Sequence, residues 1–506
     1  MNTRRDFLKG TAWMGLTAAV AGCRMPGFNL GAGGKMAMWA DKPFKKLRVG
    51  IVGLGRGQAG VSGFNVIPGC EITAICDLDA TRIKYTLDRC KEAKRPRPTV
   101  YTGGPEEWKR LCDDGNVDLV YNATPWELHV PIALYAMGAG KHVATEVPSA
   151  FTLDQCWELV ETSEKLERHC MQLENCCYGE AEMLALNLVK SGVLGEVVHG
   201  EGGYIHDLRT YNYGDWNYDY VAKHDPTTAD DAWRKDRNGY DPYWNFWRLR
   251  HNIAHKGNQY PTHGLGPVCW YMDINRGDRF DYLVSLESDQ KNFTTFAKNK
   301  FQASDPIDGW KTRQAVEMGD MNTLLIKTAL GRSIMIQHDV SSPRPYTRIN
   351  RVTGTAGSFE GIDFLDESAK EEAAAMSVIS GCTCRFGWET EAGKGVHTYF
   401  DAKKMQEMRE KYRHPLYQAA GAIAKKMGGH GGMDFMMVLR LAYCLQNGLP
   451  LDQNVYDLAS WCSLCELSEK SVKSRSSSVS VPDFTCGGWK TTPPLKLEFD
   501  LAKLGV

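Results

Sequence analysis

The stretch Leu47-Arg-Val-Gly-Ile-Val-Gly-Leu-Gly-Arg-Gly57 decides the fold of this chain. Residues 47–53 form a short β-branched run that ends in glycine, which is typical of a buried strand in a parallel sheet. Gly53, Gly55 and Gly57 follow this strand and would open a helix, where glycine lets the backbone turn tightly and approach a pyrophosphate. The glycine spacing departs from the strict GxGxxG pattern, because Gln58 occupies the third position, so the motif needs support from its surroundings.

That support comes from the segments that follow. Apolar runs recur at 71–76, 117–123, 141–145 and 170–173, and helical patterns alternate with them. Thr152 and Gln155 have the spacing of a capping box, which predicts a helix start. Alternation of strands and helices predicts a doubly wound parallel sheet, a Rossmann domain, over residues 46–170.

Polar residues at the strand ends predict what this domain binds. Asp77 stands at the end of the second strand, where an acidic residue takes the adenosine ribose hydroxyls and repels a 2′-phosphate. We therefore predict NAD rather than NADP. Trp126, His129 and Glu146 follow two later strands, and the ends of parallel strands meet at one crevice.

The pattern changes after residue 170. Alternating residues at 196–206, 281–287, 322–329 and 333–337 predict antiparallel strands, and helices are expected at 181–190 and 433–446. Residues 171–506 are therefore predicted to form an α+β substrate domain around an open, mainly antiparallel sheet. Residues 211–247 form a loop dense in Tyr, Trp and Asp, long enough to build or cover a site.

The N-terminus predicts export. Thr3-Arg-Arg-Asp-Phe-Leu-Lys9 is typical of a twin-arginine signal, and an apolar stretch too short to span a bilayer follows it. The stretch ends at Val20-Ala-Gly-Cys23, which resembles a lipoprotein cleavage box with Cys23 as the acylated residue; ordinary cleavage is the alternative. We expect a signal over 1–23, a linker over 24–45, and a periplasmic protein or membrane-anchored lipoprotein that was folded, with its cofactor loaded, before export.

Composition excludes other partners. The formal net charge of −1 over 506 residues gives no electrostatic reason to expect nucleic acid, or contact with a membrane other than through a lipid anchor. Cys76, Cys112 and Cys170 lie within or beside apolar runs and are expected to be buried free thiols. Cys462 and Cys465 have metal-ligand spacing, but no second pair accompanies them, so we predict no metal site.

At the strand ends the chain resembles the Gfo/Idh/MocA oxidoreductase superfamily, with two departures. That superfamily carries Glu-Lys-Pro where this chain has Glu146-Val147-Pro148, and the lysine serves proton transfer in its sugar dehydrogenases. Its members also tend to carry Asp where Gln259 precedes Tyr260-Pro-Thr-His263. Both departures point away from ordinary dehydrogenation.

A narrower resemblance is to glycoside hydrolase family 109, the NAD-dependent α-N-acetylgalactosaminidases. It rests on Lys141–Pro148, Leu173–Asn175 with Tyr178, Tyr204–Arg209, Trp247–Arg250, Tyr260–Pro267, Asn275–Asp281 and Gly429–Asp434. The resemblance implies an NAD site lined by Arg56, Gly57, Asp77, Trp126, His129, Glu146, Val147 and Asn175. It implies a sugar site formed by Tyr204, Arg248, Tyr260, His263 and Tyr346, with Tyr178 and His263 as the acid/base candidates.

The chemistry implied by this family needs no pair of catalytic carboxylates. Hydride leaves C3 of the sugar for NAD, the C2 proton becomes acidic, and the C1 aglycone is eliminated. Water then adds at C1, C2 is reprotonated, and the hydride returns to C3, so tightly bound NAD is recycled. His263 would act near O3 and Tyr178 near C2, or the reverse, on a terminal α-N-acetylgalactosamine or galactose.

Two other functions remain open at this point. One is an exported sugar oxidoreductase that keeps NAD or NADP bound and passes the hydride to a second small molecule; Val147 in place of lysine argues against it. The other is a surface protein that binds glycans without turnover, and the acid/base candidates argue against that.

Overall fold

The computed structural model describes residues 34–213, 246–305, 309–362, 378–379, 382–391 and 393–504. The expected signal over 1–23, with Cys23, and most of the loop at 211–247 lie outside the described residues. Among the helices that the structure does describe, none has the length and apolarity that a membrane crossing requires.

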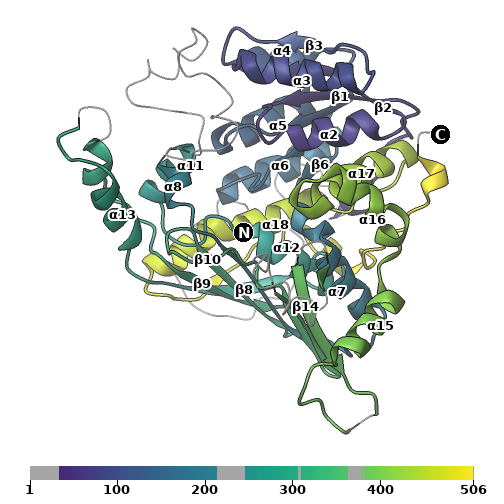
Figure 1. Ribbon diagram of the computed structural model, residues 1–506, viewed down its shortest axis with the longest axis vertical. Coiled ribbons are helices and arrows are strands. Elements are labelled where there is room, and N and C mark those ends of the chain that lie inside the picture. The colour runs from purple at the N-terminus through teal and green to yellow at the C-terminus, as the bar shows by residue number, and fades with distance from the viewer. Residues whose placement is uncertain are drawn as a thin grey trace.

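The first sheet is parallel throughout and confirms the predicted Rossmann domain (Figure 1). Its order is β3-β2-β1-β4-β5-β6, so the chain reverses direction across the sheet between β1 and β4. The strands are β1 Leu47–Val52, β2 Cys70–Cys76, β3 Thr99–Tyr101, β4 Leu119–Asn122, β5 His142–Thr145 and β6 Cys170–Gln172. The helices are α2 Gln58–Val66, α3 Ala80–Glu92, α4 Glu107–Asp113, α5 His129–Gly138 and α6 Leu153–Leu166, which begins at the predicted capping box of Thr152 and Gln155.

The second sheet has the order β13-β14-β12-β11-β7-β10-β9-β8-β15. Its neighbours are antiparallel except β7 and β10, so the mainly antiparallel sheet is also confirmed. The strands are β7 Val197–Ile205, β8 Phe280–Glu287, β9 Asn322–Thr328, β10 Ser333–Asp339, β11 Arg351–Gly354, β12 Gly357–Ile362, β13 Val378–Ile379, β14 Cys382–Trp388 and β15 Val479–Ser480.

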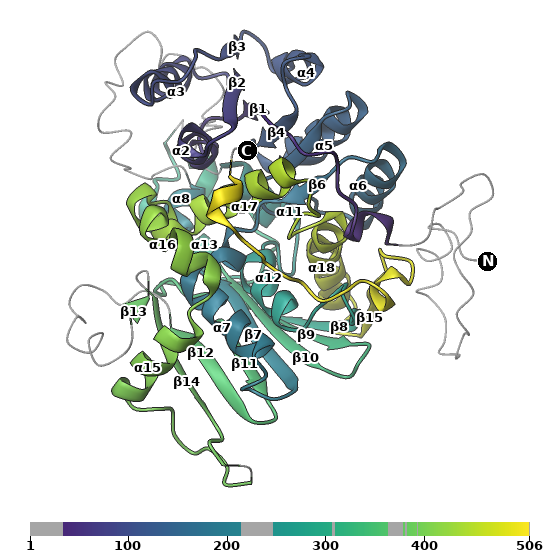
Figure 2. The same cartoon turned by 90° about the vertical axis from the view of Figure 1, so that its right-hand side faces the viewer.

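Three helices lie between the two sheets and carry or support the site (Figures 1 and 2). They are α12 Thr262–Tyr271, α17 Met433–Asn447 and α18 Val455–Lys473. The short 3-10 helix η3 Asn175–Tyr178, which follows β6, contacts both α12 and α17. α12 approaches β7 so closely that a Cβ on Gly202 would lie 2.1 Å from the Gly264 carbonyl oxygen, which only glycine allows.

The remaining helices surround these elements. α7 Glu180–Lys190 contacts β12 and β14 of the second sheet, α15 Ala402–Tyr412 contacts α7, and α16 Pro415–Met427 contacts α17. α13 spans Asn292–Lys300. α8 Arg209–Asn212 and α11 Phe246–Ala254 flank the predicted loop, and α11 carries Arg248.

The segment before β1 differs from the prediction. Residues 34–46 are not a free linker, because Met36 and Ala37 are buried and the Met36 amide donates a hydrogen bond to the Tyr456 hydroxyl at 3.2 Å. The predicted linker over 24–45 is therefore wrong for its described part, residues 34–45. The segment lacks a periodic pattern, yet its isolated apolar side chains bury area against α6 and α18, which is enough to hold it.

Cysteine usage agrees with the prediction. Cys76, Cys112 and Cys170 are buried free thiols. Cys462 and Cys465 lie one turn apart in α18, buried in the core, and the Cys462 thiol donates to the Gln172 side-chain oxygen at 2.8 Å.

Candidate functional site

The turn between β1 and α2 has the geometry of a dinucleotide site. Gly53 has a φ of +85°, and a Cβ there would lie 2.5 Å from the Ala123 carbonyl oxygen. A Cβ on Gly57 would lie 2.1 Å from the Gly53 carbonyl oxygen. Both positions therefore require glycine, as a close approach of backbone to a ligand would.

Asp77 stabilises the turn between β1 and α2. It follows β2 and accepts a hydrogen bond from the Leu54 amide at 2.6 Å, while Arg82 of α3 lies 3.8 Å from the same carboxylate oxygen. The turn opens beside the point where strand order reverses, between β1 and β4. Ligands of open α/β sheets bind at such a switch point, so Gly53, Gly55, Gly57 and Asp77 fit the predicted NAD site.

The next two strand ends meet beside this turn. The Trp126 indole donates to the Val147 carbonyl oxygen at 3.2 Å. His129 is buried behind them, with its ring nitrogens 2.9 Å from the Pro148 and 2.8 Å from the Thr124 carbonyl oxygens. His129 therefore joins the two loops instead of facing the site.

Glu146 carries an unusual carboxyl group at the same place. Burial raises its pKa to about 7, against the opposing effect of Arg56. Its Oε2 accepts a hydrogen bond from the Val147 amide at 3.3 Å. A carboxyl group that titrates near neutral pH is suited to proton transfer.

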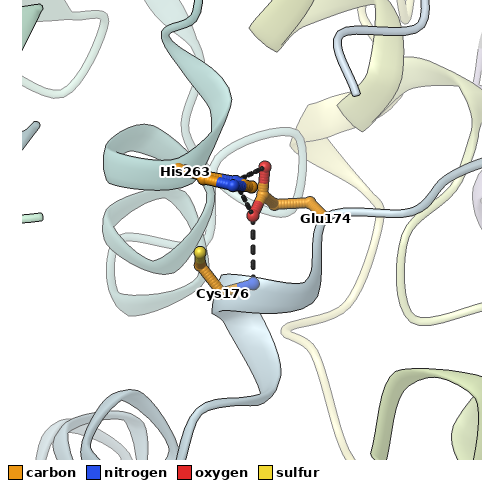
Figure 3. Close-up of side chains that lie close together, drawn as sticks. All are labelled: Glu174, Cys176 and His263. Atoms are coloured by element: carbon orange, nitrogen blue, oxygen red, sulfur yellow. Dashed lines mark hydrogen bonds and ion pairs between the residues drawn. The ribbon is translucent and has the colours of Figure 1, made fainter. Parts of the chain in front are cut away.

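His263 and Glu174 form a buried pair, which we term the inner dyad (Figure 3). His263 Nδ1 lies 2.7 Å and 3.0 Å from the two Glu174 oxygens, and the Cys176 amide donates to the same carboxylate at 3.0 Å. Burial alone would raise the pKa of Glu174, but its interaction with His263 and its hydrogen bonds with Thr262 and Cys176 together outweigh burial, so the pKa of this carboxyl is lowered. The ionised Glu174 thus accepts a hydrogen bond from the Nδ1–H group, which keeps the proton on Nδ1 and leaves Nε2 as the basic nitrogen.

The protonation state of His263 also favours a base. Burial lowers the pKa of His263, and Glu174 offsets only part of this effect. The side chain of Glu174 is 0% exposed and that of His263 is 13% exposed, so only the imidazole reaches toward a ligand. A histidine oriented by a buried carboxylate is the arrangement that general-base sites use.

Glu174, Cys176 and His263 also form a group that could hold a metal ion, because one ligand atom from each lies within 4.8 Å of the others. The group is already engaged within the protein: Glu174 binds His263, and Arg348 Nη1 donates to the Cys176 thiol at 3.4 Å. The predicted absence of a metal requirement stays a prediction.

Aromatic rings surround the inner dyad and bring the predicted sugar residues together. The Tyr260 and Tyr204 ring centroids lie 4.8 Å and 5.3 Å from that of His263. The Arg248 guanidinium lies 5.1 Å from the Tyr260 ring, and also 5.1 Å from the Trp126 ring of the cofactor side. Tyr346 lies 6.2 Å from Tyr204. A cation among aromatic faces beside an oriented base can bind a sugar ring and its polar groups.

Asn175 lies beside the dyad, but Tyr178 does not. The Asn175 amide nitrogen donates to Asp434 of α17 at 2.5 Å. Tyr178, at the other end of η3, is 0% exposed and its hydroxyl donates to Asp452 at 3.2 Å. The structure therefore does not bring Tyr178 to the site predicted for it, because η3 turns its ring into the core against Trp270.

Sequence reasoning missed four residues that the structure places here. Glu174 lies within the motif Leu173–Asn175, but only its neighbour Asn175 was predicted to line the site. His206 lies just after the end of β7, and its ring is 5.9 Å from that of Tyr204 and 4.9 Å from that of Tyr346. His430 and Asp434 have helical i, i+4 spacing, and a test for histidine–carboxylate pairs at that spacing would have found them.

Comparisons with known proteins agree with this geometry. Residues 47–173 match the oxidoreductase family with an NAD-binding Rossmann fold, and residues 178–491 match the C-terminal domain of glycosyl hydrolase 109. A solved structure of levoglucosan dehydrogenase with NADH and levoglucosan superimposes with a TM-score of 0.57 at 17% identity, covering 87% of this chain and 100% of that one. An oxidoreductase domain protein from Kribbella flavida gives 0.59 at 18% identity over 87% of this chain and 100% of that one. These two show the fold alone.

Curated relatives are much more similar. A glycosyl hydrolase family 109 protein of Shewanella putrefaciens is 42% identical over 89% of this chain and 87% of its own length. An α-N-acetylgalactosaminidase of Bacteroides fragilis is 40% identical over 89% of this chain and 95% of its own length. With the family match over the C-terminal domain and these relatives along nearly the whole chain, the protein belongs to glycosyl hydrolase family 109.

Proposed function

We propose that this protein is a glycosidase that removes terminal α-N-acetylgalactosamine from glycans with the help of tightly bound NAD. The observation that carries the proposal is the inner dyad, whose imidazole packs against Tyr204 and Tyr260 while its carboxylate interacts with Glu146 of the predicted cofactor site. The name of the Bacteroides fragilis relative supports the choice of sugar.

The residues that would hold NAD are Gly53, Gly55, Gly57 and Asp77 at the first two strand ends, with Arg56, Trp126, Glu146, Val147 and Asn175 beside them. His129 supports the loops that carry them. When bound, NAD would supply a reversible acceptor for the C3 hydride of the sugar. Loss of that hydride would make the C2 proton acidic, so that C2 can be deprotonated and the aglycone can leave before water adds. Val147 supports this route, because it is packed among the aromatics and offers no proton where the dehydrogenases of the superfamily have lysine.

The proton transfers fall to this chain's own side chains. His263 Nε2 is the base for the sugar, and Glu174 is a positioning residue that fixes its tautomer. Glu146 is the second group able to exchange a proton near neutral pH. Tyr178 loses this role, since its hydroxyl is bound to Asp452. We assign recognition of the acetamido group to Arg248 or Tyr260, whose guanidinium and ring lie 5.1 Å apart beside His263.

Export belongs to the same proposal. Bound, recycled NAD would let the enzyme work outside the cytoplasm, where the twin-arginine signal would take it already folded. Acylation of Cys23 would anchor it to a membrane. Fractionation of cells that express the full chain, with and without Cys23→Ser, would test both statements: the wild type is expected in the membrane fraction and the variant in the periplasm.

Activity is tested with purified protein and no added NAD. We expect p-nitrophenol release from the α-N-acetylgalactosaminide, less from the α-galactoside and none from the β-N-acetylgalactosaminide, with NAD recovered from the denatured protein. If NAD is recovered but no glycoside is cleaved, the oxidoreductase alternative replaces this proposal. If neither is seen, the cofactor assignment itself is wrong.

A further inference from the structure

The inner dyad has a third neighbour, the Cys176 thiol, which no step of the proposed reaction uses. One ligand atom from each of Glu174, Cys176 and His263 lies within 4.8 Å of the others. Figure 3 shows the Cys176 sulfur pointing from η3 toward His263. A thiolate, an imidazole and a carboxylate together suit Zn²⁺ or Co²⁺, whereas Mg²⁺ and Ca²⁺ prefer oxygen ligands.

The three ligand atoms are close to the spacing that such an ion needs. Tetrahedral Zn²⁺, with bonds of about 2.0–2.3 Å, holds its ligand atoms about 3.3–3.6 Å apart. His263 Nδ1 lies 2.7 Å from one Glu174 oxygen, so this pair must open by roughly 0.6 Å when a metal replaces the proton between them. The sulfur must approach by no more than about 1.3 Å, which small side-chain rotations can supply.

Charge and hydrogen bonds also favour a divalent ion in this buried position. The thiolate and the carboxylate carry two negative charges, so a bound divalent ion would leave no net charge among the ligands. Arg348 is already paired with Glu182 at 2.8 Å, and its Nη1 donates to the Cys176 sulfur at 3.4 Å. The Cys176 amide donates to Glu174 at 3.0 Å. Hydrogen bonds of this kind orient metal ligands and stabilise a thiolate.

We propose that Glu174, Cys176 and His263 form a binding site for zinc or a similar thiol-binding divalent ion, and that the bound ion inhibits the enzyme. On binding, the Cys176 thiol releases its proton to solvent and the sulfur donates an electron pair to the metal. The metal takes the place of the Nδ1 proton of His263, and Nε2 gains a proton from solvent, so the imidazole stays neutral. A water molecule fills the fourth position, as in open zinc sites.

Inhibition follows from the proton on Nε2. The proposed reaction needs Nε2 of His263 as the base, and the metal holds the imidazole in the tautomer that has this nitrogen protonated. Glu174 is 0% exposed, so the metal lies behind the imidazole and outside the sugar pocket. We therefore expect Zn²⁺ to lower kcat while KM changes little. The inhibition rests on the proposed function, whereas the binding of the ion does not.

Binding is tested with Co²⁺, whose spectrum reports a sulfur ligand without an assay of activity. NAD-loaded protein is treated with a chelator, freed of it and titrated with CoCl2. We expect the charge-transfer band of a cobalt–thiolate bond and the visible bands of a tetrahedral site. Cys176→Ser should lose these bands, and Cys176→Ala serves as a second variant should the serine variant not fold. Cys177→Ser is the matched control and should keep them, because the Cys177 sulfur packs against Gly266 of α12.

Inhibition is measured with Zn²⁺ and p-nitrophenyl α-N-acetylgalactosaminide, and each variant is referred to its own activity without metal. The Zn²⁺ concentration that halves kcat should rise about 100-fold in Cys176→Ser and stay within about 2-fold of the wild-type value in Cys177→Ser. A chelator should restore the activity of the wild type.

Three results would overturn the inference: no cobalt–thiolate band in the wild type, a band that survives loss of the Cys176 thiol, or equal inhibition of the wild type and Cys176→Ser. Inhibition that raises KM alone would place the metal in the sugar pocket and would overturn it as well. Absence of glycoside cleavage by the metal-free wild type would refute the proposed function, and the cobalt spectra would then still support or overturn the metal site.

Discussion

Two buried carboxylates, Glu174 and Asp452, contact opposite ends of η3, and they differ in the basic side chain with which each one pairs. Glu174, just before η3, pairs with the imidazole of His263, whereas Asp452 pairs with the guanidinium of Arg440 through contacts of 2.7 Å and 2.9 Å and also accepts from Tyr178. Gln453 connects the two regions, because it follows Asp452 and hydrogen bonds the Glu174 backbone at 2.9 Å and 3.2 Å.

The different cations determine which of the two pairs, Glu174–His263 or Asp452–Arg440, can take part in proton transfer. A guanidinium keeps its proton at every accessible pH, and the Arg440–Asp452 pair is closed off in the core. An imidazole can change protonation near neutral pH, and that of His263 is partly exposed beside Tyr204 and Tyr260. We therefore assign catalysis to the network of Glu174 and stability to that of Asp452.

The largest effect is expected when the inner dyad is broken. His263→Gln should lower kcat by about 1,000-fold or more, because it removes the base without opening the core. Glu174→Gln should lower kcat in the same direction by less, since the imidazole remains but its tautomer is no longer fixed. Thermal melts should stay near that of the wild type. Full activity in His263→Gln would place the base elsewhere.

Asp452→Asn should reverse this pattern. Leaving Arg440 buried without its counter-charge is expected to cost about 3–5 kcal/mol of unfolding free energy. Urea denaturation measures this cost, and kcat of the protein that remains folded should change little. A large loss of kcat at unchanged stability would refute the division between the two networks.

Glu146 should make stability depend on pH. Its folded pKa of about 7 lies above the value near 4.3 expected for an unfolded glutamate, so the folded state holds the extra proton between these values. The unfolding free energy should therefore fall as pH rises from about 4.5 to 7, by up to about 3 kcal/mol, and level off above pH 7. Glu146→Gln should remove this slope, as denaturation of NAD-free protein at several pH values would reveal.

The smallest effect is expected from Tyr178→Phe. The variant loses one hydrogen bond to Asp452, whose charge Arg440 still balances, so the unfolding free energy should fall by about 1 kcal/mol. Activity should stay within about 2-fold of the wild type. A loss of kcat beyond about 100-fold would restore Tyr178 as an acid/base group.

These networks mark the limit of what the sequence predicts. The strands of the Rossmann sheet could be predicted because buried parallel strands are continuous apolar runs with a glycine or an acidic residue at their ends. The Glu174–His263 contact joins residues 89 positions apart and depends on how closely α12 packs on β7, which no local pattern records. The acid/base role predicted for Tyr178 was wrong for the same reason, because its place in a motif did not indicate the direction in which η3 would orient its ring. The start of α18 could have been found, because Asn454 and Asp457 form a capping box.

The most direct test of the account follows the C2 proton. Purified protein without added NAD is incubated in D2O with p-nitrophenyl α-N-acetylgalactosaminide, and the released sugar is analysed by NMR. The account predicts nitrophenol release with deuterium at C2, since C2 is deprotonated and reprotonated in each turnover. An absence of nitrophenol release by protein that carries bound NAD would contradict it.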